Sequence, residues 1–347
     1  MESEEQIQQA ADEAELMLCD CRESVRPIGT DEVRFSRGFL RADASAWFDL
    51  SASWSPLFHV LGVQTSLVST AQKLDFPDGL ERLSVFEIEG ERGVLGADNG
   101  TCNALVAAVA ESEGLESQKS EIVLEYLERR LLSSVSSSWT GDGDLQFSYI
   151  PDGLPADVNI SGVVSLQFKL QDTPCTLWFG LGPRAVENLD ANWRSTLSGE
   201  NSSSLLSLSF QLAELAVPPA LLIDYMREGT IIDLELPISD EVTVLRDGEP
   251  WADGRLRSHN NNWAVEITNM SPDSKEFPEA TTQVRVELCN LELDGSSASE
   301  LAQVGAVIVT ASPVSPDVAL VISEEEVAHA KVGTIDGRFA LTVGGKA

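Results

Sequence analysis

The stretch GTIIDLELP, residues 229–237, returns 76 residues later as GAVIVTASP, residues 305–313. At this offset residues 229–267 align with residues 305–343 without a gap, and eight positions are identical. Average composition would give roughly two or three identities over such a length. The identical pairs are Gly229/Gly305, Ile232/Ile308, Pro237/Pro313, Ser239/Ser315, Val242/Val318, Glu249/Glu325, Ala252/Ala328 and Ala264/Ala340.

The apolar positions stay in phase as well, because Ile231 meets Val307 and Trp263 meets Phe339 at the same offset. Two unrelated segments that share the period-2 alternation of β-strands are the alternative interpretation. Alternation alone, however, does not keep glycine and proline in phase over one span. The pattern therefore predicts a duplicated module, a feature that has to be recognised before any fold class is assigned.

Each copy follows the same plan of short strands. An opening strand over residues 208–212 or 284–288 leads to Gly229 or Gly305. An apolar strand, a turn with proline and a further strand follow. Asp247-Gly248 is a typical two-residue hairpin turn in the first copy, and Asp336-Gly337 is one in the second. A unit of about 70 residues has a thin core and open sheet edges, so we expect each copy to pair with another.

The remaining chain is divided by composition into three parts. We expect an acidic helical segment over residues 1–32, an α+β domain over residues 33–195 and a linker rich in Ser and Asn over residues 196–204. The modules then occupy residues 205–269 and 270–347. Within residues 33–195 we expect helices at 104–110 and 117–139, strands at 60–68, 83–88, 145–149, 164–170 and 175–179, and turns at 92–93 and 99–100.

The charge of the chain is strongly negative, at -33 from 23 basic and 56 acidic residues. Such a surface repels nucleic acid and favours basic partners, although high solubility alone is an equal interpretation. Five cysteines at wide, irregular spacing indicate reduced thiols. Residues 1–15 do not resemble a signal peptide, and no apolar run approaches the ~18 residues of a membrane span, so we expect no direct membrane insertion.

The repeated pattern resembles the SpoA module of flagellar switch proteins and of type III secretion cytoplasmic-ring proteins, over roughly residues 205–345. The resemblance implies an α+β N-terminal domain followed by two all-β SpoA-like modules, built as small intertwined or paired β-barrel-like sheets. The second copy lacks the usual hairpin glycine of the family. The matching stretches are residues 229–237 and VTVLRDGEPWADGRL at 242–256, then residues 305–313, VALVISEEEVAHAKV at 318–332 and DGRFALTV at 336–343.

Two modules behind a longer N-terminal region resemble the SctQ/YscQ-type ring, or sorting-platform, protein of type III secretion. Flagellar switch subunits usually carry one module each. The region around residues 117–139 is similar to the middle domain of the larger flagellar switch subunit, which binds the rotor with a Gly-Gly-x-Gly loop. Residues 111–114 read ESEG here, and residues 1–18 show no regulator-binding motif. Both departures favour secretion, and a flagellar motor switch (C-ring) protein that controls rotation is the alternative.

The resemblance implies a non-enzymatic scaffold in the cytoplasm, held peripherally at the inner membrane by the secretion apparatus. Its implied partners are a stalk protein that regulates the secretion ATPase, an adaptor protein at the inner-membrane ring and chaperone–cargo complexes. It also implies self-association through the modules and pairing with a separately translated C-terminal fragment. Met270 lies where such an internal start would be expected, and an ordinary linker methionine is an equally weighted interpretation.

Apolar side chains of the two modules are the expected contacts with partners. Trp251, Trp263, Val318 and Phe339 are the first candidates, and a purely core role is the alternative for Trp263 and Phe339. The full candidate set is Val242, Val244, Trp251, Trp263, Val318, Leu320 and Phe339.

Motifs of the common enzyme classes are missing from the sequence. It has no phosphate-binding P-loop, no G-x-G-x-x-G motif and no G-x-S-x-G motif. The E-x-x-N pattern of response-regulator phosphatases needs a helix, and it occurs only at Glu266–Asn269 and Glu287–Asn290, where strands are expected. His59, His259 and His329 are too far apart for a local metal motif. We therefore expect no cofactor, no metal and no catalysis; a response-regulator phosphatase, a small-molecule carrier and a purely structural β protein are the lower alternatives.

Overall fold

The structure is a computed structural model, and it describes residues 17–18, 25–43, 64–88, 90–110, 117–138, 158–197, 205–272, 278 and 280–346. The chain divides into two compact units. One unit holds residues 34–197, and the other holds residues 1–33 together with residues 198–347.

The unit of residues 34–197 contains a five-stranded sheet with the order β2-β5-β6-β4-β3. Every neighbouring pair in this sheet is antiparallel. Strands β3 and β4 form one hairpin, and β5 and β6 form another. Alternating apolar residues of β5 and β6 face the core. The strands are β2 (Thr65–Lys73), β3 (Arg82–Ile88), β4 (Glu91–Ala97), β5 (Gly162–Leu170) and β6 (Thr173–Leu181).

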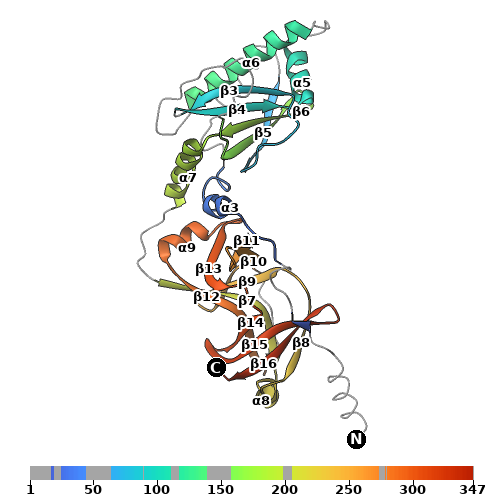
Figure 1. The fold of residues 1–347 in the computed structure, drawn as a ribbon, viewed down its shortest axis with the longest axis vertical. Helices are drawn as coiled ribbons and strands as arrows, with labels where there is room; N and C mark the ends of the chain where they lie inside the picture. The colour runs from blue at the N-terminus through green and yellow to red at the C-terminus, as the bar shows by residue number, and fades with distance from the viewer. Residues whose placement is uncertain are drawn as a thin grey trace. The chain divides into compact units, whose positions relative to one another are not determined.

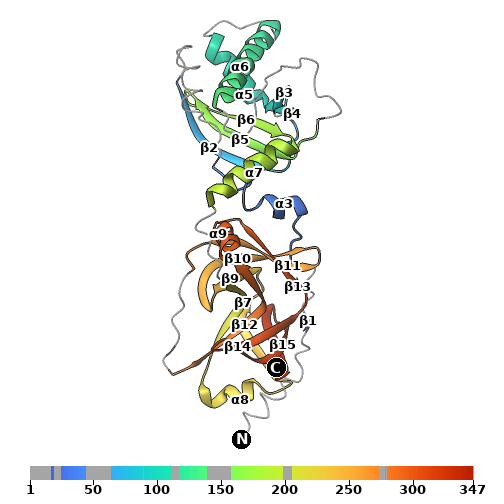
Figure 2. The same ribbon diagram turned by 90° about the vertical axis from the view of Figure 1, so that its left-hand side faces the viewer.

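Among the described residues of this unit, helices cover both faces of the sheet, and Figures 1 and 2 show α5 and α6 together on one side with α7 on the other. They are α5 (Asn99–Ala110), α6 (Ser117–Ser138) and α7 (Pro183–Leu197). Their apolar faces join the strands in one core, in which Leu127, Leu166 and Leu189 are buried. Arg82 of β3 holds Glu128 of α6 through two hydrogen bonds of 2.6 and 3.1 Å.

Several local predictions for this unit are wrong. Residues 92–93 lie inside β4 rather than in a turn, and residues 99–100 open α5, where Asp98 accepts a hydrogen bond from the Thr101 backbone N–H at 2.6 Å. Helix α7 was not predicted and extends into the expected linker. Of the expected strand at 60–68, residues 60–63 lie outside the described residues and residues 65–68 lie in β2. The expected strand at 145–149 also lies outside the described residues, whereas those at 83–88, 164–170 and 175–179 are confirmed.

The C-terminal repeats form the other sheet, and their strand bounds recur at the predicted offset. In the first copy the strands are β8 (Ile231–Pro237), β9 (Glu241–Arg246), β10 (Glu249–His259) and β11 (Asn262–Asn269). In the second copy they are β13 (Val307–Pro313), β14 (Asp317–Ile322), β15 (Glu325–Ile335) and β16 (Arg338–Lys346). The opening strands are β7 (Leu205–Val217) and β12 (Thr282–Asp294), and short helices η2 (Pro219–Leu221), α8 (Leu222–Tyr225) and α9 (Gly295–Leu301) follow them. The predicted fold class is confirmed.

The two copies are intertwined rather than merely adjacent. The strand order is β13-β11-β10-β9-β7-β12-β14-β15-β16-β8, so β13 of the second copy closes the first copy and β8 of the first closes the second. The opening strands β7 and β12 pair with each other at the centre of the order. In Figure 1, β8 of the yellow first copy lies beside β16 of the red second copy.

The cores are built from both copies because of this exchange. One core combines Phe210, Val244 and Trp263 of the first copy with Ile308 of the second. The other combines Leu320 and Leu341 of the second copy with Ile232 of the first. Leu212 and Leu288 occupy equivalent positions on the central strands, and both pack against the two cores.

The hairpin turns keep their geometry although one has lost its glycine. Asp247 and Gly248 both have positive φ, at 50° and 84°, as a two-residue turn between twisted strands requires. The equivalent residues Ser323 and Glu324 also have positive φ, at 48° and 69°. A side chain larger than glycine is strained in this region, so the second copy keeps its turn because the surrounding sheet imposes it.

The N-terminal segment contributes to the repeat unit in two described pieces. Met17–Leu18 forms β1, which pairs with Thr334 and Gly333 of β15, so these residues are extended where a helix was expected. Pro27 makes a parallel bridge to Ser258 of β10. Helix α3 (Thr30–Phe35) follows, and Val33 packs with Ile28 against Ala264 and Val307. Residues 1–16 and 19–24 of the expected helical segment, residues 1–32, lie outside the described residues.

Candidate interaction surface between the two repeats

An apolar groove of about 320 Å³ opens where the two copies meet. Most of its walls consist of residues that are equivalent in the two copies, so the groove follows the approximate two-fold relation of the repeats. Ile238 and Asp240 lie on one side only, and Val25 of the N-terminal segment also lines it. The paired lining residues are Leu212 and Leu288, Leu256 and Val332, and Trp263 and Phe339.

The structure places most of the predicted partner contacts inside the two cores. Six of the seven candidate side chains are buried, and they pack against strands of this chain itself. Trp263 and Phe339 have a second role, because both also line the groove. Contact of any of these residues with a separate partner stays a prediction. The six are Val242, Val244, Trp263, Val318, Leu320 and Phe339.

The seventh contact candidate, Trp251, and the candidate internal start, Met270, lie at the margins of the first core. Trp251 of β10 is half-buried and packs against that core. Met270 follows β11 directly and packs against the same core from a half-buried position. A side chain in this position has a structural role in the folded chain, and an internal start at Met270 stays a prediction.

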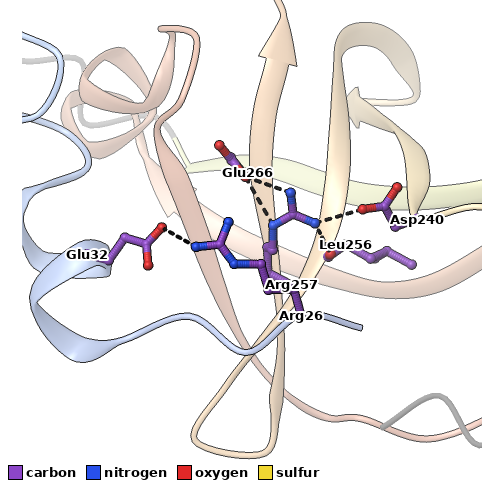
Figure 3. A network of polar contacts seen from close by, with 6 residues as sticks. All are labelled: Arg26, Glu32, Asp240, Leu256, Arg257 and Glu266. Atoms are coloured by element: carbon purple, nitrogen blue, oxygen red, sulfur yellow. Dashed lines mark hydrogen bonds and ion pairs between the residues drawn. The ribbon is translucent and has the colours of Figure 1, made fainter. Parts of the chain in front are cut away.

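A buried arginine supports the strand beside the groove in the first copy (Figure 3). The side chain of Arg257 is 7% exposed, and its guanidinium lies 2.8 Å from an oxygen of Asp240 and 2.9 Å from an oxygen of Glu266. It also donates to the Leu256 carbonyl at 2.8 Å. A buried guanidinium is tolerated only when its donors are satisfied, and here three strands or turns satisfy them.

The second copy does not repeat this network. The positions equivalent to Asp240, Arg257 and Glu266 are occupied by Pro316, Gly333 and Thr342. No charged side chain therefore fixes the edge of β15 in the way that Arg257 fixes the edge of β10. The two copies share a fold but present chemically different edges.

A polar cleft of about 630 Å³ lies on another part of the repeat unit and is also lined by both copies. Arg285 forms an ion pair with Glu287 at 3.1 Å and donates to the Gly248 carbonyl at 3.0 Å. Burial raises the pKa of the Glu287 carboxyl above its ordinary value, although Arg285 acts in the opposite direction. With Asp317 and Glu326 also in its lining, the cleft is acidic and suits a basic side chain.

Two features bear on catalysis: the described thiols are buried or half-buried, and both E-x-x-N patterns lie in strands. Burial raises the pKa values of Cys102, Cys175 and Cys289 to about 11, so these thiols are protonated at neutral pH and weakly nucleophilic. Glu266–Asn269 lies in β11 and Glu287–Asn290 in β12, as the sequence predicted. Both patterns span a β-bulge, and Glu287 and Asn290 both line the polar cleft, but neither pair has the helical spacing that the phosphatase pattern needs.

Among the residues that the structure describes, no group of three or more His, Cys, Asp and Glu side chains is arranged to hold a metal ion. None of the described helices combines the length and apolar character that crossing a bilayer requires.

The groove and Val25 are the functional features that the sequence did not reveal. The pairs that line the groove are equivalent under the 76-residue offset, so the duplication was the available signal. Locating the groove needed the exchange of β8 and β13, which places the same side of both copies together. Val25 lies in a short polar segment and carries no local pattern that marks it.

The comparison with protein families matches the C-terminal repeats. Residues 205–271 and 275–347 each match the family described as Type III flagellar switch regulator (C-ring) FliN C-term. No curated protein matches the chain.

Among solved structures, the FliM middle domain from Helicobacter pylori has 13% identity and a TM-score of 0.34, covering 47% of this chain and 99% of that one. FliM in the FliG–FliM complex from the same organism has 12% identity and a TM-score of 0.30, with coverages of 44% and 93%. FliY of Thermotoga maritima has 14% identity and a TM-score of 0.30, with coverages of 48% and 98%.

The two family matches coincide with the two copies that share strand bounds, turns and the groove. Each of the two repeats therefore matches the FliN-type (SpoA) C-terminal domain, and the two matches lie in tandem within residues 205–347.

Proposed function

We propose that this protein is a scaffold of the cytoplasmic ring, or sorting platform, of a type III protein secretion system. In this role it lies in the cytoplasm at the inner membrane and joins a stalk protein of the secretion ATPase, an inner-membrane adaptor and chaperone–cargo complexes. The observation that carries the proposal is the intertwined pair of FliN-type domains within one chain. One chain then supplies a complete paired unit.

The groove between the repeats is the proposed site for an amphipathic segment of the stalk protein. Its walls are aliphatic and aromatic, whereas Asp240 borders it and the chain carries a charge of -33. An apolar stripe flanked by basic residues would fill the groove and meet the acidic surface, which favours encounter as well as affinity. A role as a flagellar switch protein uses the same surface with different partners.

Affinity capture with the full chain tests this proposal when it is compared with two variants. Ile238 lines the groove and is 45% exposed, whereas Ile223 of α8 is 80% exposed and lies outside the groove lining. I238D should reduce retention of the stalk protein and its ATPase at least tenfold, and I223D should leave it unchanged. Capture of flagellar rotor proteins by the wild-type chain would assign the motility role. Equal retention of the stalk protein by both variants would show that the groove is not its binding site.

A further inference from the structure

Two strand edges in the repeat unit extend beyond their neighbours. Strand β10 pairs with β9 only as far as Arg255, opposite Glu241, after which the Leu256 N–H donates to the Asp240 carbonyl. Strand β15 pairs with β14 only as far as Lys331, opposite Asp317, after which the Val332 N–H donates to the Pro316 carbonyl. Residues 257–259 and 333–335 thus each present an edge that β9 and β14 do not cover, and an open edge readily accepts a further strand.

The N-terminal segment covers both of these edges at equivalent positions. At the first edge, the Ser258 N–H donates to the Arg26 carbonyl at 3.1 Å, and the Ile28 N–H donates to the Ser258 carbonyl at 2.8 Å. At the second edge, Met17 lies opposite Thr334 and Leu18 opposite Gly333. Ser258 and Thr334 are separated by the repeat offset of 76 residues. One segment therefore uses the same position twice, once in each repeat.

The pairing directions of the two described pieces agree with the relation between the two repeats. Residues 17–18 run antiparallel to β15, whereas Pro27 makes a parallel bridge to β10. Equivalent strands of a two-fold pair run in opposite directions, as the antiparallel pairing of β7 with β12 indicates. Two pieces of chain that run in the same direction are then antiparallel to one strand and parallel to its equivalent, as residues 17–18 and Pro27 are.

The same segment also closes one part of the apolar groove. Val25 is 7% exposed and lines the groove together with Leu256 and Val332, which lie two residues before Ser258 and Thr334. Arg26 extends outward and lies 3.7 Å from Glu32 (Figure 3). His259 adds a contact of 3.1 Å between its Nδ1 and the Ile28 carbonyl. Backbone pairing and the buried side chains of Val25 and Ile28 together hold the segment.

We propose that residues 17–18 and 25–28 form a strap that is the chain's own ligand for a peptide-binding surface shared by the two repeats. The surface consists of the two open edges and the groove between them. Each edge N–H and C=O can serve one added strand at a time, so another extended segment must displace the strap before it binds. The strap is thus a built-in competitor. The inference rests on the geometry of this chain and does not require the secretion role, although it would regulate the groove proposed above.

A labelled peptide of residues 17–28, with Cys19 and Cys21 replaced by serine, tests the strap in the full-length chain. The variant V25D places a charge in the groove and should release the strap, because an unpaired carboxylate is costly to bury. By fluorescence anisotropy, the peptide should bind V25D at least tenfold more tightly than it binds the wild-type chain. A peptide that carries the same V25D change should not bind, and E32Q, which removes only the exposed contact with Arg26, should behave as wild type.

Equal affinity for wild type and V25D, or no binding to a folded V25D chain, would overturn the proposal. Self-association of V25D without peptide binding would assign the surface to a second copy instead. If V25D does not fold, hydrogen exchange of the wild-type chain decides. The Ser258 and Ile28 amides should then exchange at least tenfold more slowly than an unstructured peptide, and fast exchange at both amides would contradict a strap. The peptide assay does not involve the stalk protein, so it can succeed even where the scaffold proposal fails.

Discussion

Ile232 of the first repeat lies opposite Leu341 of the second, and Ile308 of the second repeat lies opposite Val265 of the first in the same register. Each of these four side chains is buried. The exchange therefore carries apolar side chains as well as backbone hydrogen bonds from one repeat into the other. Neither repeat completes its core with its own residues, so the two should unfold together.

The exchange predicts that a substitution in one repeat loosens the other. I232A should lower the free energy of unfolding by about 2–5 kcal/mol, because a buried isoleucine loses its packing and leaves a cavity. Hydrogen exchange measured under native conditions should show the largest loss of protection in β16 of the second repeat. The matched variant I308A should instead affect β11 of the first repeat. Loss of protection confined to the repeat that carries each substitution would contradict the exchange.

The buried arginine predicts an asymmetric contribution to stability. R257Q should destabilise the repeat unit by about 1–3 kcal/mol, since hydrogen bonds to a charged group are lost and the partly exposed partners Asp240 and Glu266 soften the effect. R255Q is the control, because Arg255 is exposed on the same strand. Chemical denaturation monitored by circular dichroism gives both values. Similar free energies of unfolding for the two variants would show that the Arg257 network does not stabilise the repeat unit.

Glu287 predicts a dependence of stability on pH. Its pKa is raised in the folded chain by burial, so the folded state binds the proton more tightly than the unfolded state does. The free energy of unfolding should therefore fall as pH rises from the ordinary carboxyl pKa of 4.5 through the raised value. E287Q should remove this part of the pH dependence and be more stable than wild type at pH 7. Thermal melts of both proteins between pH 4 and 8 would show curves that converge at the acidic end; a constant difference would argue against the raised pKa.

The three described cysteines should resist alkylation in the folded protein. With pKa values raised to about 11 by burial, Cys102, Cys175 and Cys289 have on the order of one thiolate in a thousand at pH 8. Mass spectrometry after iodoacetamide treatment should find them largely unmodified, and modification should rise when urea unfolds the chain. Rapid labelling of Cys289 without denaturant would show that the cleft beside it opens.

The duplication was predictable because glycine, proline and apolar residues keep their phase over 39 aligned positions. The α+β character of residues 34–197 was predictable from periodicity, whereas Arg92-Gly93 and Asn99-Gly100 were misread as turns. In β4 the lack of a side chain at Gly93 leaves room for the Phe86 ring, and at Asn99 the Asp98 carboxylate begins a helix. Tertiary packing in one case and a helix cap in the other outweighed the turn propensity.

The exchange of β8 with β13 was anticipated only as one of two possibilities, because period-2 patterns fix which residues are buried but not which copy buries them. The same ambiguity explains why predicted partner contacts lie in the cores. Val244 and Leu320 were predicted to contact partners, whereas the structure buries both in the cores, and contact with a partner stays a prediction. The strap was missed because its contacts are mainly backbone hydrogen bonds, which leave little trace in side-chain pattern.

Light scattering on residues 270–347 tests the intertwined unit most directly. This fragment contains β12 to β16 but lacks β8, the strand that closes its core in the full chain. In a homodimer, β13 of each copy can pair with β16 of the other, where β8 pairs in the full chain. We therefore expect a folded dimer at micromolar concentration. A folded, stable monomer would contradict the exchange of strands between the two repeats.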